Sequence, residues 1–471
     1  MEGNPIQEGN QIEIFGFIQL RKGRIYMKKI VLSAVIGIIL CLMLSLAVIY
    51  LIPQKAVKKQ IEESAHFLVE KELFPYIKQN TFNTRQDNYA DAILLNIIYY
   101  SDSSKAWRSV LEAPFYKPEV SEVNDNLLKA VKENPKPNAE YSRYWHGSMV
   151  FLRPLLCVMN LQQIRIFLTG IVIAMLGISN ILLIRRGVIG FVVSLLIGFL
   201  IINGWMIAFS LEYVMTFLVM SVALLAVILT NSSSVSDEKK RNRIGYIFAL
   251  SGVFTCFVDF LTTETLSFTI PMLVLLVLQE KNGQLKYWKD VLKQIVLYGL
   301  IFMVSYACMF FLKWILATIT IGKKALDSAI GSVMERSIGT VTMGQSTLDP
   351  SATTLQKLGG ALWKNIGCLF PFKEMMSAPA VYTALFCCIL FLFSCVYLFH
   401  GTSYYSNLGM SMLLLSLIPF LRFLLLSNHS YLHYFFTYRA LLVSVVGAIY
   451  YTGKCCEEYW KRRWKRQWKR I

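Results

Sequence analysis

Two carboxylates lie one helical turn apart in the stretch DNYADAILLNIIYY, which is otherwise mostly apolar. These acids are Asp87 and Asp91. Because residues four apart are neighbours on a helix surface, the spacing places both side chains on one face. A carboxylate that lies against a hydroxyl group can act as a general base. Asp87 and Asp91 are therefore candidates for chemistry on a hydroxyl group, and the alternative for both acids is a solvated helix face.

Basic, histidine and tyrosine side chains gather in two further stretches, YSRYWHG and NHSYLHYFFTYR. The residues that we expect to bind a lipid phosphate or another part of a substrate are Arg143, Tyr144, His146, His429, His433, Tyr438 and Arg439. Such side chains donate hydrogen bonds to phosphate oxygens, and those from a charged donor are the strongest. The spacing of His429 and His433 would also suit a metal ion, or both could belong to an aromatic cluster. The sequence leaves a metal requirement and any cofactor open.

A second pair of acids interrupts the apolar stretch FVDFLTTETLSFTIP. The acids are Asp259 and Glu264. Since an ionised acid at the bilayer centre costs about 2.5–3.5 kcal/mol, we expect both at the extracytoplasmic interface. They either bind substrate or a metal ion, or the segment caps the following helix through its threonines. Arg422, also within an apolar run, is expected to pair with an internal acid or to approach lipid phosphate.

The composition indicates which class of protein must position these residues. Of the 471 residues, 55% are hydrophobic and only 16% are charged, and the mean hydropathy is +0.50. A helix needs about 20 apolar residues to cross a bilayer, and about ten segments are candidates. They are residues 30–52, 162–184, 187–205, 213–230, 244–263, 265–279, 294–317, 379–399, 408–426 and 436–452. We predict an all-α, polytopic integral membrane protein with about ten transmembrane helices.

The distribution of Lys and Arg predicts how the chain is oriented in a cell membrane. Basic residues precede the first candidate span and follow the second, fourth, sixth and tenth, whereas segments 206–212 and 427–435 have none. Because short cytoplasmic loops are enriched in Lys and Arg, both termini are expected in the cytoplasm. The net charge of +18 is thereby explained without a nucleic-acid partner.

The predicted organisation alternates membrane segments with two long outer loops. Its parts are a basic cytoplasmic N-terminus (1–29), the first transmembrane helix (30–52), an extracytoplasmic loop with surface helices (53–161), transmembrane helices 2–7 (162–317), a second extracytoplasmic loop (318–378), transmembrane helices 8–10 (379–452) and a basic, Trp-rich cytoplasmic tail (453–471). The tail places Trp460, Trp464 and Trp468 four residues apart among cations, so we expect it to bind lipids of the inner membrane surface.

This layout resembles the GT-C superfamily of polyprenyl-phosphate-dependent membrane glycosyltransferases. An anchor helix is followed by a long outer loop with acids and surface helices, and then by many spans. DNYADAILLN and YSRYWHGSMVFLRPLL also look like segments of bacterial membrane proteins of this type. The resemblance implies that an acid of the first outer loop is the catalytic base, which in this chain would be Asp91 or Asp87. In the superfamily this acid commonly lies close after the first span, where this chain has Glu62 and Glu63.

The resemblance also implies a reaction and its partners. Arg143, His146 and Arg439 would hold the lipid phosphate of a lipid-linked sugar donor, and the acceptor would be a cell-surface glycan or lipid. Two alternatives remain open at this point. A transporter or flippase for lipid-linked saccharides would be expected to place charges along a midplane path, whereas a non-enzymatic scaffold of surface-polymer assembly would not need these acids and bases together.

Overall fold

The computed structural model describes residues 5–78, 83–118, 122–285, 287–338, 353–370 and 403–468. The first part contains α1 (Pro5–Leu51), α2 (Gln54–Val69), α3 (Asn88–Tyr100), η1 (Ser103–Lys105), α4 (Ala106–Glu112), β1 (Pro114–Phe115), α5 (Val123–Glu133), β2 (Ala139–Glu140) and α6 (Met149–Leu155). The middle part contains α7 (Leu161–Arg185), α8 (Ile189–Ile201), η2 (Gly204–Phe209), α9 (Leu211–Ser232), α10 (Asp237–Val258), α11 (Leu266–Lys281) and α12 (Trp288–Ile321). The last part contains α13 (Lys323–Ile338), α14 (Thr354–Gly367), α16 (Ser403–Leu425), α17 (Ser427–Leu432), α18 (Tyr434–Thr437), η3 (Tyr438–Leu441) and α19 (Leu442–Trp468).

Six helical segments of the described chain are long and apolar enough to cross a membrane. They are Tyr26–Leu51, Leu161–Arg185, Leu211–Ser232, Trp288–Ile321, Asn407–Leu425 and Tyr434–Glu457. These segments indicate an all-α, polytopic membrane protein, and the two antiparallel strands β1 and β2 are a small addition to it. Of the other predicted spans, three overlap α8, α10 and α11, and 379–399 lies outside the described residues. The number ten stays a prediction.

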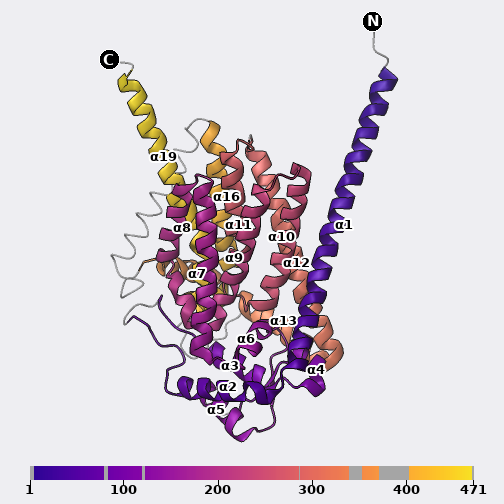
Figure 1. The fold of residues 1–471 in the computed structure, drawn as a ribbon, viewed down its shortest axis with the longest axis vertical. Coiled ribbons are helices and arrows are strands. Elements are labelled where there is room, and N and C mark those ends of the chain that lie inside the picture. Colours follow the sequence, from indigo (N-terminus) through magenta and orange to yellow (C-terminus); the bar gives the residue numbers. More distant parts are fainter. Residues whose placement is uncertain are drawn as a thin grey trace.

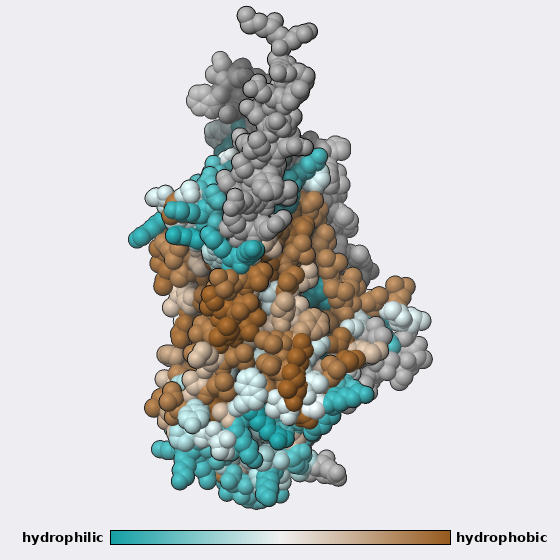
Figure 2. Space-filling view, turned by 90° about the vertical axis from the view of Figure 1, so that its right-hand side faces the viewer, coloured by the Kyte–Doolittle hydropathy of each residue, from teal (hydrophilic) through white to brown (hydrophobic). Residues whose placement is uncertain are grey.

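The long helices form a bundle, and the short ones gather at one end of it. In Figure 1, α2 to α6 and α13 lie at the lower end, whereas both chain termini lie at the upper end. Figure 2 shows a brown apolar band between two teal hydrophilic ends, as expected where a bilayer surrounds the middle of the bundle. We call the end with α2 to α6 the loop end.

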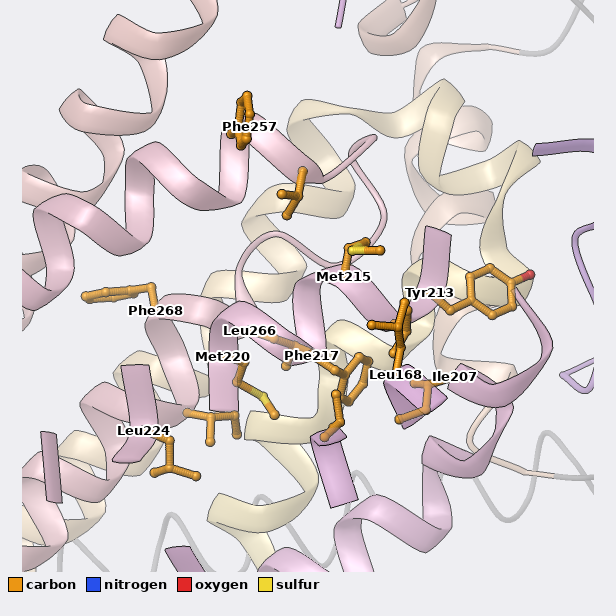
Figure 3. Packing of buried hydrophobic residues seen from close by; sticks show 14 of the residues in the cluster. Leu168, Ile207, Tyr213, Met215, Phe217, Met220, Leu224, Phe257, Leu266 and Phe268 are labelled. Carbon is orange, nitrogen blue, oxygen red and sulfur yellow. The ribbon is translucent and has the colours of Figure 1, made fainter. Parts of the chain in front are cut away.

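Helix α9 lies at the centre of the apolar core. Figure 3 shows its Met215, Phe217 and Met220 packed among side chains of α7, η2 and α11. At the start of α7, Asn160 and Gln163 form a reciprocal cap, in which each side chain accepts a hydrogen bond from the other's backbone amide, at 3.2 and 3.0 Å. Such boxes satisfy amides that have no partner within the helix, so these residues define where the helix begins.

Two fully buried cations join the loop end to the bundle. Arg153 of α6 donates to the carbonyl oxygens of Ile52 after α1 at 2.9 Å, and of Ile98 in α3 at 2.7 Å. Lys313 of α12 donates to the carbonyl oxygens of Val110 and Leu111 in α4, at 2.7 and 2.9 Å. The last carbonyls of a helix lack partners within it, and cations there are favoured by the helix dipole.

Replacing Lys313 by methionine is expected to lower the free energy of unfolding by about 1–3 kcal/mol, because two buried carbonyl groups lose their donor. Unfolding of the purified protein in detergent, followed by circular dichroism, measures this change. Lys293→Met is the matched control, since Lys293 is an exposed residue of the same helix. A Lys313→Met variant as stable as the control would contradict the role given to this side chain.

Candidate functional site

The loop end of the bundle encloses a cavity of about 150 Å³. Its walls come from α3, the segment between β2 and α6, the first turn of α9, α13 and α17. The polar residues that line it are Asp87, Tyr89, Tyr141, Arg143, Tyr144, His146, Glu212, Glu335, Arg336, Asn428, His429 and His433. We call it the loop-end cavity. It brings together six of the residues predicted from sequence: Asp87, Arg143, Tyr144, His146, His429 and His433.

Asp87 lies at the wall of the cavity as the N-cap of α3. One carboxylate oxygen accepts a hydrogen bond from the amide of Ala90 at 2.8 Å, which satisfies an otherwise unpaired helix amide. The other oxygen receives no hydrogen bond from the described residues. Burial, assisted by the nearby charge of Asp91, raises the pKa of Asp87 to about 7. A carboxyl group with this pKa can accept a proton near neutral pH.

Asp91 has different surroundings, although it lies only one turn further along. It forms an ion pair with Arg165 of α7 at 2.6 Å and is fully buried. The hydroxyl of Ser210 and the amide of Leu211, at the start of α9, donate to the same carboxylate at 3.1 and 2.9 Å. Both oxygens are therefore occupied, and Asp91 does not line the cavity. Its carboxylate ties α3 to α7 and α9.

Two guanidinium groups lie in the wall of the cavity. Arg143 donates to the hydroxyl of Ser332 in α13 at 3.1 Å and lies over the ring of Tyr141. Arg336 of α13 lies over the ring of Tyr144. The buried Nε atoms of both arginines have no hydrogen-bond partner among the described residues. Each arginine therefore keeps donors for an anionic ligand, and aromatic rings hold both cations in place.

The end of α13, which carries Arg336, is fixed by hydrogen bonds from α17. Asn428 donates from its side-chain amide to the carbonyl oxygen of Glu335 at 2.8 Å, and Ser427 donates to that of Ser337 at 2.6 Å. These bonds satisfy carbonyls at the helix end. From the sequence we predicted an outer loop over residues 318–378, which includes Arg336, but we assigned no role to this residue.

His146 is held in an unusual backbone conformation. Its φ of 52° lies in the left-handed region, which is uncommon for residues other than glycine. Nε2 donates to the carbonyl oxygen of Tyr141 at 3.0 Å, so Nδ1 carries the lone pair and has no partner among the described residues. Burial lowers the pKa of His146 to about 3, which keeps the ring neutral. The next residue, Gly147, allows this turn to approach Phe257, since a Cβ atom there would lie 2.4 Å from that ring.

His429 and His433 lie side by side in the cavity wall, with ring centroids 4.7 Å apart. Nδ1 of His429 lies 3.3 Å from a guanidinium nitrogen of Arg422. Burial lowers the pKa of His429 well below its usual value and that of His433 to about 3. The part of the chain that the structure describes contains no group of three or more His, Cys, Asp or Glu residues that could hold a metal ion.

The second acidic pair of the sequence lies beside the cavity rather than in its wall. Asp259 accepts hydrogen bonds from the hydroxyl of Thr216 at 2.6 Å and from the amide of Thr262 at 3.1 Å. Glu264 forms an ion pair with Arg422 at 2.8 Å. The expectation that Arg422 pairs with an internal acid is confirmed. Thr262 also donates its hydroxyl to Asp259, so a threonine satisfies the acid within the turn.

Tyr438 and Arg439 also lie outside the cavity wall. The hydroxyl of Tyr438 donates to the carbonyl oxygen of Ile202 at 2.8 Å, which joins η3 to the end of α8. Arg439 is buried, with its guanidinium over the rings of Tyr213 and Tyr438 at 4.7 and 5.1 Å. Its Nε and Nη2 atoms have no hydrogen-bond partner among the described residues. Arg439 therefore keeps free donors, but not toward the loop-end cavity.

Three charged residues of the cavity wall, Glu212, Glu335 and Arg336, were not identified from the sequence. Glu212 lies in the first turn of α9, two residues after the N-cap Ser210. An acid is common there because its negative charge interacts favourably with the helix dipole. Arg336 lies in α13, near Glu335, and resembles an ordinary surface charge. Their positions in the sequence did not indicate that they share a site. The packing of α9, α13 and α17 brings them together.

Comparison with known proteins adds no relative to this geometry. No protein-family model, curated protein or solved structure matches the chain. The site must therefore be interpreted from its own residues.

Proposed function

We propose that this protein is a membrane glycosyltransferase that moves a sugar from a polyprenyl-phosphate donor to a cell-surface acceptor. One observation carries the proposal: a buried carboxylate with an unoccupied oxygen, Asp87, shares one cavity with two guanidinium groups that keep free donors, Arg143 and Arg336. A base together with a phosphate-binding group is what this transfer requires. The cavity also lies at an end of an apolar bundle, where a lipid-linked substrate has access.

The reaction would proceed as one displacement. Asp87 accepts the proton of the acceptor hydroxyl, whose oxygen forms a bond to the anomeric carbon of the sugar. The bond between this carbon and the phosphate oxygen breaks, and the electron pair leaves with the lipid phosphate. Arg143 and Arg336 stabilise the negative charge on that phosphate, and His146 offers no added charge because it is neutral. Attack opposite the leaving group inverts the anomeric centre.

The proposed membrane arrangement follows the charge pattern. About ten spans with both termini in the cytoplasm place the loop end, and with it the cavity, on the outer face of the cell membrane. The basic tail after the last span then lies at the inner surface, where Trp460 and Trp464, which are exposed, would contact lipid headgroups.

Mass spectrometry of lipids and surface glycans from cells with and without the gene tests this function. We expect loss of one sugar unit from a surface polymer or lipid, with accumulation of its polyprenyl-phosphate donor. A lipid-linked saccharide that accumulates on the inner leaflet would instead indicate a flippase. Unchanged donors and glycans would contradict a transferase function and favour a non-enzymatic scaffold.

Transfer is expected to depend on pH through Asp87. Since only the deprotonated carboxylate accepts a proton, and burial raises the pKa of Asp87 to about 7, the rate should be half-maximal near that pH. Below it, the rate should fall about tenfold for each pH unit. Initial rates in membrane vesicles, with the donor identified from lipid extracts, give this profile. A rate that stays constant from about pH 5 to about pH 8 would contradict a base with this pKa.

A further inference from the structure

The loop-end cavity contains a carboxylate that the proposed transfer does not use. Glu212 lines the cavity and is only 8% exposed. Within the described chain, no hydrogen bond or ion pair reaches its carboxylate, whereas Asp91 and Glu264 each have an arginine partner. A buried ionised carboxylate is costly unless it is paired. The ligand that fills the cavity is therefore expected to supply the missing partner.

The backbone that carries Glu212 is fixed. The amide of Glu212 donates to the hydroxyl of Ser210 at 3.2 Å, and the amide of the preceding Leu211 donates to Asp91. The residues that follow, Tyr213 and Met215, are buried in the packing shown in Figure 3. Glu212 is thus presented to the cavity by a rigid helix end, which is how preformed specificity sites are built.

The charges of the cavity wall point to a positively charged partner. Its three carboxyl groups, from Asp87, Glu212 and Glu335, form no ion pair with Arg143 or Arg336 among the described residues. The histidines of the wall add no positive charge at neutral pH, because burial lowers their pKa values. A phosphate bound by Arg143 and Arg336 would occupy these cations and leave Glu212 without a positively charged partner. A neutral sugar would bring no positive charge to Glu212 either.

We propose that Glu212 determines specificity by accepting hydrogen bonds from a protonated amino group on the sugar of the donor. This inference rests on the proposed function and narrows its substrate class to amino sugars. An ammonium group brings a positive charge and three donors, whereas a hydroxyl brings one donor and no charge. Asp87 is not the partner of this group, because its free oxygen must receive the proton of the acceptor.

Binding of two matched sugar phosphates to the purified full-length protein tests the inference. Glucosamine 1-phosphate and glucose 1-phosphate share a ring and a phosphate and differ in one amino group. By isothermal titration calorimetry, we expect glucosamine 1-phosphate to bind at least about tenfold more tightly, which is about 1.4 kcal/mol. In Glu212→Gln this preference should fall to about onefold, while Glu63→Gln, at an exposed position of α2, should keep it.

Each outcome decides the matter. Equal affinities in the wild type, a preference that survives in Glu212→Gln, or no binding of glucosamine 1-phosphate would overturn the inference. Cooperative unfolding of Glu212→Gln with the wild-type midpoint shows that its fold is intact. The proposed function is tested separately by the donors and glycans of cells that lack the gene. If glycans are altered but the two sugar phosphates bind equally well, the proposed glycosyltransferase function is retained and only the specificity for amino sugars is rejected.

Discussion

Asp87→Asn is expected to reduce sugar transfer by about 10²–10⁴-fold, the usual effect of removing a general base. Asparagine has nearly the shape of aspartate and caps helices about as well, so its side-chain oxygen can still accept from the amide of Ala90. The substitution therefore removes the proton acceptor and keeps the cap. Cells that carry only Asp87→Asn should accumulate the lipid-linked donor to the same degree as cells without the gene.

Protein amount and stability serve as controls in that experiment. Asp87→Asn should be present in the membrane at the wild-type level and should unfold at a similar temperature. Asp125→Asn, which changes an exposed carboxylate of α5, should transfer sugar normally. Normal glycans in cells with Asp87→Asn would show that Asp87 is a cap and nothing more, and the base would have to be sought elsewhere.

Asp91→Asn should act on stability instead. We expect it to lower the free energy of unfolding by about 3–5 kcal/mol, since Arg165 would stay buried without its counter-charge. The effect should appear as a lower unfolding midpoint in detergent and as less protein in the membrane. Any loss of transfer should be proportional to the loss of folded protein.

A second substitution distinguishes an ion pair from a catalytic group. In Asp91→Leu combined with Arg165→Met, neither charge remains, and stability should recover in part, because apolar pairs often replace buried ion pairs at little cost. Transfer per folded molecule should then be close to that of the wild type. A stable double variant that is inactive would instead return Asp91 to the role of base.

The helical membrane class could be predicted because hydropathy is a local property of the sequence. The different surroundings of Asp87 and Asp91 could not. The i, i+4 spacing assumes that both residues belong to the helix, but Asp87 is the residue before it, with φ −121° and ψ 81°. The capping conformation turns its carboxylate toward the cavity, while Asp91 on the helix itself meets Arg165.

The contributions from distant segments were the least accessible from sequence. Tyr438 and Arg439 lie only a few residues after His433. Short helical turns separate them from the histidines. Tyr438 and Arg439 therefore contact α8 and α9 instead of the cavity. Glu212 and Arg336 reach the cavity only through packing between helices far apart in the chain. Spacing along one segment carries no information about such contacts.

Lys313 has a consequence for how the protein is made. The carbonyl oxygen of Val110 accepts a hydrogen bond from Lys313, which lies 203 residues further along the chain. At a synthesis rate of about 5–20 residues per second, about 10–40 s pass between the appearance of the two groups at the ribosome. During that interval the segment from α2 to α6 has already left the ribosome while α12 is still missing. The packing of α4 is therefore completed late in biogenesis, because it depends on the synthesis of α12.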